Sequence, residues 1–324
     1  MKKLTKLSAL ILALAMLLAL TACGGGTASD AGSDSYTIGI CQLVQHDALD
    51  AATQGFKDAL TEKLGDKVKF DEQNASGEQT NCATIVDGFV ANGVDLIMAN
   101  ATAPLQTAAS ATSTIPVLGT SVTDYATALD IDNWTGAVGT NVSGTSDLAP
   151  LDQQAAMVKE LFPDAKTVGL LYCSSEPNSI YQCTVIDGYL KEYGYTVEWF
   201  SFTDSNDISS VTENACAACD VIYIPTDNAA ATNTEAIANV VIPNGVPVIT
   251  GEEGPCKGCG VATLSISYYD LGFQTGLMAY EILVNAADVS TMAVQFAPEV
   301  TLKYNADICA QLGVTVPDTY VAIE

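Results

Sequence analysis

The segment VDLIMANATAPLQTAA (residues 94–109) decides the fold, because an apolar strand in it passes directly into a helix. Its run LIMA is uninterrupted, as in strands that a parallel sheet buries on both faces. The same order returns in CDVIYIPTDNAAATNT (residues 219–234), and a second local match joins residues 38–56 to residues 168–189. Two copies of one strand–helix plan predict two α/β lobes of the same topology.

Strands and helices alternate through both halves of the chain. We expect strands at 36–44, 67–73, 94–100, 115–121, 166–174, 195–202, 220–228 and 246–254, and helices at 47–65, 78–93, 104–111, 178–194, 209–219 and 231–241. This alternation predicts a doubly wound parallel sheet in each lobe, with right-handed crossovers.

Small polar residues follow the predicted strands. The junctions are QHD (45–47), ATAP (101–104), SVTD (121–124), SSEPNS (174–179), TDN (226–228) and GEEG (251–254). In an open parallel sheet, ligands bind beyond the carboxyl ends of the strands. Two lobes that face each other would therefore gather all six junctions around one cleft.

The N-terminus has the layout of a bacterial lipoprotein signal. Three lysines in residues 1–6 precede an apolar run through Leu20, which is short for a membrane span of about 20 residues. The following LTAC resembles a lipobox, so we expect a signal peptide at 1–22, lipid on Cys23 and a flexible linker at 23–35. The protein would then be extracytoplasmic, held on a bacterial cell membrane by its lipid. An ordinary secretory signal with an incidental cysteine is the alternative.

Charge excludes several kinds of partner. The 324 residues carry 38 acidic side chains against 12 basic ones, and all 12 are lysines, giving a net charge of −26. Nucleic acid and anionic membrane surfaces are poor partners for such a chain. The acidity mainly serves solubility.

The mature chain resembles a known family. It is similar to the substrate-binding proteins of bacterial tryptophan/tyrosine-type ABC transporters, which have the type I periplasmic-binding-protein fold. The stretches that carry the resemblance are ICQLVQHDALDAATQGF (40–56), TSVTD (120–124), NVSGTSDLAP (141–150), SSEPNSIYQ (174–182), IYIPTDN (222–228), GEEG (251–254) and ATLSISYYDLGFQTG (262–276).

The resemblance implies a hinge of three crossings. Lobe 1 would comprise residues 36–146 and 265–290, and lobe 2 residues 147–264 and 291–324. A monomer would capture a small molecule in the cleft, an aromatic or other apolar amino acid, and deliver it to a membrane permease, without a cofactor, metal or catalysis. A sugar or nucleoside ligand, or a sensory receptor, is the alternative.

An amino acid offers a carboxylate to the cleft. A helix start can hold it, because free N–H groups and the helix dipole favour an anion. The run from Glu176 through Asn178 and Ser179 supplies such a start, although these residues also suit simple capping. Hydroxyls and N–H groups near Thr120 can serve in lobe 1, and Lys257 is the one lysine nearby.

The ammonium group needs an acceptor. Asp227 is the first choice, with an Asx turn as the structural alternative, and Glu176, Glu252 and Asp147 follow. Aromatic or apolar walls could come from Tyr268 and Tyr269 or from Leu43 and Val44. The full candidate ligand-binding set is Gln42, His46, Thr102, Thr120, Ser121, Val122, Glu176, Asn178, Ser179, Thr226, Asp227, Asn228, Glu252, Tyr268 and Asp270.

The sequence does not show the arrangements of side chains that are typical of enzyme active sites. The single histidine, His46, sits at a strand end and a helix start, where it suits the cleft rim. No GxSxG elbow accompanies it, and the adjacent acids of GEEG point in different directions. An exported enzyme is therefore disfavoured.

Ten cysteines include two C-x-x-C pairs, Cys216/Cys219 and Cys256/Cys259. A shared zinc site is disfavoured, because Cys219 precedes one strand and Cys256 follows its parallel neighbour, about 17 Å away along the strand. We expect one or two local bridges at most. A Cys256–Cys259 link and two buried thiols are both open.

Overall fold

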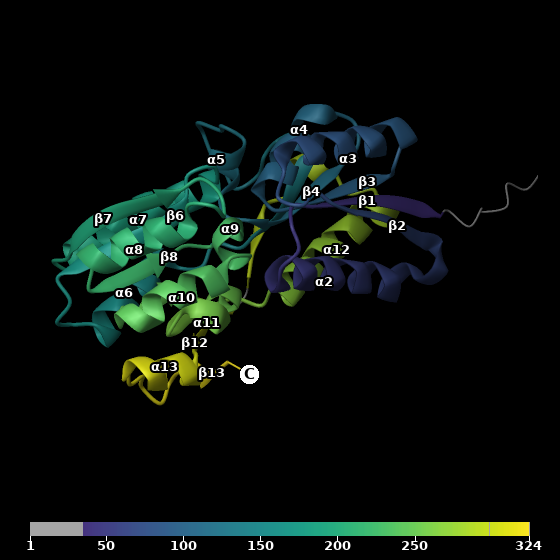
Figure 1. Cartoon of the computed structure of the whole chain (residues 1–324). Coiled ribbons are helices and arrows are strands. Elements are labelled where there is room, and N and C mark those ends of the chain that lie inside the picture. The colour runs from purple at the N-terminus through teal and green to yellow at the C-terminus, as the bar shows by residue number, and fades with distance from the viewer. Residues whose placement is uncertain (1–34, 298, 324) are drawn as a thin grey trace, which may run out of the picture. The chain divides into compact units, whose positions relative to one another are not determined.

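The computed structural model describes residues 35–297 and 299–323, and the chain from Tyr36 onward forms one compact unit (Figure 1). The predicted signal peptide, Cys23 and all but the last residue of the predicted linker lie outside these residues. Of the helices that the structure describes, none has both the length and the apolarity needed to cross a membrane.

A parallel sheet of six strands forms the first lobe, in the order β11-β5-β4-β3-β1-β2. The strands are β1 (Tyr36–Gln42), β2 (Val68–Asn74), β3 (Leu96–Asn100), β4 (Val117–Val122), β5 (Val142–Ser146) and β11 (Gln295–Phe296). Its helices are α2 (Asp47–Leu64), α3 (Gln79–Asn92), α4 (Thr102–Ala111), α5 (Tyr125–Ala128) and α12 (Tyr268–Asn285), with short 3-10 turns at η1 (Gly65–Lys67) and η2 (Val289–Thr291).

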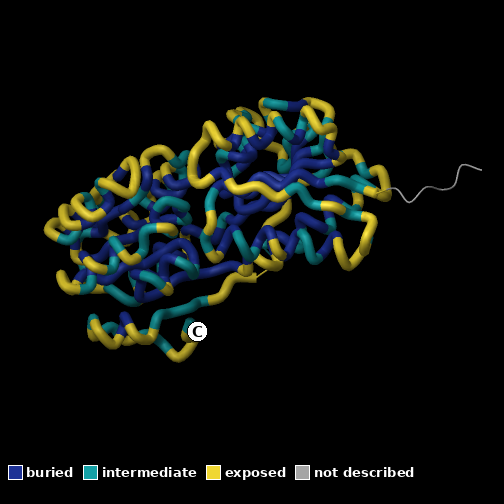
Figure 2. Tube along the Cα trace, turned by 45° about the vertical axis from the view of Figure 1, so that its right-hand side comes forward, coloured by how far each residue is buried: buried dark blue, intermediate teal, exposed yellow. Residues whose placement is uncertain are grey.

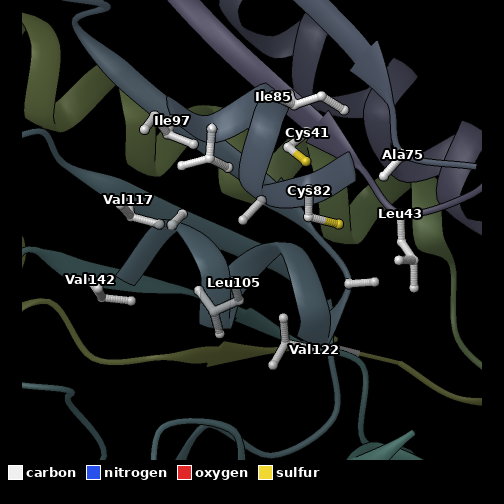
Figure 3. Close-up of a cluster of buried hydrophobic side chains, with 14 of the residues drawn as sticks. Cys41, Leu43, Ala75, Cys82, Ile85, Ile97, Leu105, Val117, Val122 and Val142 are labelled. Carbon is white, nitrogen blue, oxygen red and sulfur yellow. The ribbon is translucent and has the colours of Figure 1, made fainter. Parts of the chain in front are cut away.

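Separate apolar cores lie on the two faces of this sheet. Helices α3 and α4 cover one face, and α2 and α12 cover the other (Figure 1). The core under α3 and α4 includes Cys41 from β1 and Cys82 from α3, which lie close together among aliphatic side chains (Figure 3). Both faces are closed, as the uninterrupted apolar strand at 96–99 requires.

Seven strands form the sheet of the second lobe, in the order β13-β12-β10-β9-β8-β6-β7, where only β10 and β12 pair antiparallel. The strands are β6 (Thr167–Cys173), β7 (Thr196–Phe202), β8 (Val221–Ile224), β9 (Val248–Thr250), β10 (Ala262–Ser265), β12 (Thr301–Tyr304) and β13 (Val321–Ala322). The helices are α6 (Leu151–Leu161), α7 (Pro177–Glu192), α8 (Ile208–Ala218), α9 (Asn228–Ala231), α10 (Thr234–Asn244), α11 (Glu253–Cys259) and α13 (Ala306–Leu312).

The predicted α/β class with two parallel-dominated sheets is confirmed. Helices α6 and α7 bury their apolar faces on one side of the second sheet, and α8 and α10 on the other. The tube in Figure 2 shows a buried interior in each lobe beneath exposed turns.

The chain passes between the lobes after β5, after β10 and after β11. The last passage differs from the expected start of lobe 2 at residue 291. Strand β11 pairs with β5 of the first sheet, and Ser143 Oγ donates to the carbonyl of Met292 at 3.0 Å. Residues 291–296 therefore belong to lobe 1, and a strand of two residues is too short to leave a period in the sequence.

Candidate functional site

Two hydrogen bonds join the lobes across the cleft. His46, before α2, lies with Nε2 3.1 Å from Asn228 Oδ1 at the start of α9. Gln182 Nε2 donates to Thr123 Oγ1 at 3.3 Å. Burial lowers the pKa of His46, which favours the neutral ring. The strand ends of the two sheets thus meet face to face, as the polar junctions predict.

Glu176 is engaged within its own lobe. Its carboxylate accepts from the backbone N–H groups of Asn228 and Ala229 at 3.1 and 2.8 Å, and from Asn228 Nδ2 at 2.7 Å. Asn178 Nδ2 donates to the same carboxylate and to the carbonyl of Thr226. Glu176 therefore binds the start of α9 and orients Asn228 toward His46, whereas no side chain caps α7 itself.

The carboxylate of Asp227 also accepts hydrogen bonds within its own lobe. One oxygen accepts from the N–H of Cys173 at 2.7 Å and the other from the N–H of Ala230 at 2.8 Å. The residue is fully buried, and burial with the nearby Glu176 raises its pKa to about 7. Each oxygen of Asp227 thus already accepts one backbone N–H, and its role as an ammonium acceptor stays a prediction.

Three expected residues of lobe 1 face its interior. Gln42 accepts from Thr53 Oγ1 at 2.6 Å, and its amide donates to the side chain of Asp50 at 2.6 Å. Thr120 Oγ1 lies 3.1 Å from the hydroxyl of Thr145. Val122 belongs to the apolar core. Their side chains are engaged within lobe 1, and a ligand contact by any of the three stays a prediction.

Of four other expected residues, three are buried and one, Asp270, is exposed. Ser121, in a left-handed conformation with φ 55°, is buried with no partner for its Oγ, and Thr102 is buried at the start of α4. Ser179 is fully buried in α7. Asp270 is exposed in the first turn of α12 and lines neither of the cavities described below.

A buried cluster at the hinge holds two acids and a tyrosine. The hydroxyl of Tyr268 donates to Asp147 Oδ2 at 3.0 Å and also contacts Glu252. Asp147 Oδ1 and Glu252 Oε2 are buried without a hydrogen-bond partner. Burial raises the pKa of Asp147 to about 6 and that of Glu252 to about 8.

An open cavity adjoins this cluster. It has a volume of about 330 Å³ and is lined from both lobes and the hinge, with Glu252, Lys257, Ile266, Tyr268 and Tyr269 in its wall. A second cavity of about 410 Å³ shares Lys257 and extends to His46. Carboxylates, an ammonium and aromatic rings therefore surround one space.

Gln182 and Asp147 are both missing from the candidate ligand-binding set, although Asp147 is one of the alternative acceptors for the ammonium group. Gln182 stands one helical turn after Asn178, so an i, i+4 spacing from the predicted cap pointed to it. Its amide also contacts Thr226, with the side-chain oxygen accepting from the backbone N–H at 3.1 Å. Thr123 lies in the same SVTD junction as the chosen Ser121.

The nine described cysteines carry no disulfide. Cys256 and Cys259 are two buried thiols on α11, which is the second of the two alternatives left open by the sequence. Burial raises the pKa of Cys259 to about 12, which keeps the thiol protonated. Within residues 35–297 and 299–323, no group of three or more His, Cys, Asp or Glu side chains is arranged to hold a metal ion.

Comparison with known proteins identifies relatives. The family described as "ABC transporter substrate binding protein" matches residues 37–323. The tyrosine-binding protein of Clostridioides difficile (strain R20291) is 35% identical over 275 residues, covering 82% of this chain and 79% of that protein.

Two solved structures differ in how well they superpose. An ABC domain from Streptococcus pneumonia in complex with L-Trp is 33% identical, covers 88% of this chain and 96% of its own, and gives a TM-score of 0.83. The ligand-free, open structure of a substrate-binding protein with adhesive properties from Clostridium difficile is 36% identical. It covers 89% of this chain and 100% of its own, and its TM-score is 0.68. At similar identity, the arrangement seen here is closer to that of the L-Trp complex.

Proposed function

Because this chain belongs to the ABC transporter substrate-binding proteins, a family of binding proteins and not of enzymes, we propose that it captures an aromatic amino acid between its lobes and delivers it to a membrane permease. Tyrosine and tryptophan are the first candidates, since one relative is named for tyrosine and another was solved with L-Trp. Lipid on Cys23 would hold the receptor on the membrane beside its permease.

The observation that carries the proposal is the cavity beside the hinge cluster. An amino-acid ligand presents an ammonium group, and two buried carboxylate oxygens beside the cavity have no partner. Its carboxylate can reach Lys257, which forms no ion pair among the described residues, whereas Lys303 is paired with Glu253. Tyr268, Tyr269 and Ile266 provide a wall for an aromatic side chain.

The contacts between the lobes also explain how a ligand would close them. The bonds His46–Asn228 and Thr123–Gln182 exist only when the lobes meet. A ligand that contacts both lobes therefore shifts the population toward the closed form. A permease could distinguish this form from the open, empty one.

A thermal-shift screen tests the proposal. The purified protein is unfolded and refolded to remove retained ligand, and then tested with the twenty amino acids, common sugars and nucleosides. Binding to the folded state alone adds about 2.7 kcal/mol at 100 times the dissociation constant, so a rise of several degrees is expected with tyrosine, tryptophan or phenylalanine. A rise only with a sugar or nucleoside would refute the amino-acid proposal.

A further inference from the structure

The hinge cluster draws its members from separate segments. Asp147 follows β5 at the first crossing, Tyr268 begins α12 after the second, and Glu252 follows β9 in lobe 2. Their exposed fractions are 4%, 8% and 2%. The fold therefore brings three polar side chains together where the lobes join. No single stretch of the sequence predicts this contact.

Hydrogen bonding inside the cluster is incomplete. A tyrosine hydroxyl has one proton to donate, and that of Tyr268 goes to Asp147 Oδ2. Asp147 Oδ1 and Glu252 Oε2 remain without a donor, although the hydroxyl of Thr123 near Asp147 and that of Tyr268 near Glu252 each lower the pKa of the acid. No described lysine or histidine forms an ion pair with either acid. Burying ionised oxygens in this way is unfavourable unless a donor arrives or a proton is taken up.

We propose, as a refinement that rests on the function proposed above, that Asp147 and Glu252 together form the ammonium subsite of the ligand cleft. A primary ammonium carries three N–H donors, enough to serve both free oxygens at once. The adjoining cavity is lined by Glu252 and Tyr268, and Asp147 lies next to this wall, where it accepts from the Tyr268 hydroxyl. Asp227 has no comparable vacancy, because both of its oxygens accept backbone N–H bonds.

The subsite also couples binding of an ammonium ligand to the release of protons. Glu252 is surrounded by Asp147, Asp227, Glu176 and the hydroxyl of Tyr268, and its pKa is raised from 4.5 to about 8, chiefly by burial and then by the charge of Asp147. The remaining charges on the cavity wall are those of Asp47, Glu253, Lys257 and Lys303. An ammonium ligand favours the ionised acids, so its binding releases protons at pH 7, and its affinity rises as the pH rises from 6 toward 8.

Paired ligands test the assignment. L-tyrosine is compared with 3-(4-hydroxyphenyl)propanoate, which lacks only the ammonium, by titration calorimetry in two buffers of different ionisation enthalpy. The variants are Glu252→Gln and Asp147→Asn, which keep side-chain size. Glu281→Gln is the matched control, because Glu281 lies near the other end of α12 and contacts Asn285. L-tryptophan and indole-3-propanoate form a second pair.

In the wild type and the control, we expect the ammonium to improve affinity by about 100-fold and proton release to accompany binding. In both cluster variants the preference should fall below about tenfold and proton release should shrink. Cluster variants that fold and keep the full ammonium preference would overturn the subsite while leaving the proposed function intact. A wild-type protein that binds neither amino acid would instead refute the proposed function.

Tyr268→Phe provides a second measurement if a charge variant fails to fold. Losing the hydroxyl removes the donor to Asp147 but leaves both acids in place. The ammonium preference should then persist, with proton release at least as large as in the wild type. Loss of that preference in Tyr268→Phe, with neither charge variant affecting it, would contradict the assignment.

Discussion

Replacing Asp227 by alanine is expected to lower the free energy of unfolding by about 2 to 4 kcal/mol. Its carboxylate accepts from the N–H groups of Cys173 and Ala230, and the residue is fully buried. Each buried N–H that loses its acceptor costs about 1 to 3 kcal/mol. Urea unfolding, monitored by circular dichroism without ligand, measures the change.

Asp124 supplies the matched control in lobe 1. It caps α5 through one bond from the N–H of Thr127 at 2.7 Å, in a more exposed position. Asp124→Ala should therefore cost only about 1 kcal/mol, as for an ordinary N-cap. If Asp227→Ala kept its stability and lost only ligand affinity, Asp227 would be a ligand acceptor, as the sequence first suggested.

Gly272→Ala is expected to destabilise the protein by about 3 kcal/mol or more. Helices α2 and α12 are distant in sequence but pack closely (Figure 1). A Cβ on Gly272 would lie 1.9 Å from the carbonyl oxygen of Ala52, and one on Gly55 would lie 2.1 Å from that of Tyr269. The clash is with backbone, so the helices must move apart. Overpacking typically costs about 1 to 3 kcal/mol, and a contact this short with backbone belongs at or above the upper end of that range.

Gly188→Ala is the control for helix propensity. Gly188 lies within α7, and a Cβ there meets nothing within 4 Å. Alanine should then stabilise by about 0.5 to 1 kcal/mol. Thermal unfolding measures both variants, and a Gly272→Ala protein as stable as the wild type would show that α2 and α12 do not pack as closely as described.

The fold could be predicted because its signals are local. Uninterrupted apolar strands such as residues 96–99, each followed by a polar junction and a helix, predict a parallel sheet without knowledge of any distant contact. Strand β11 was missed for the opposite reason. A strand of two residues is too short to show the alternation of apolar and polar side chains that indicates a strand. Only its pairing with β5 places it in lobe 1.

The meeting of the polar junctions could be predicted from the sequence, but the hydrogen-bond partners of their side chains could not. The polar strand ends of the two lobes do meet, yet the side chains of Gln42 and Thr120 are engaged within lobe 1 by Thr53 and Thr145. Such partners come from elsewhere in the chain, so the sequence gives no local sign of them. The hinge cluster of Asp147, Glu252 and Tyr268 likewise depends on how three segments meet.

A crystal structure with L-tyrosine or L-tryptophan would show where the amino acid binds and which side chains hold its ammonium group. We expect the amino acid between the lobes, with its nitrogen about 3 Å from Asp147 Oδ1 and Glu252 Oε2. The bonds His46–Asn228 and Thr123–Gln182 should be present in that complex. An amino acid bound outside the cleft, or an ammonium held by Asp227 with Glu252 still lacking a donor, would contradict the account.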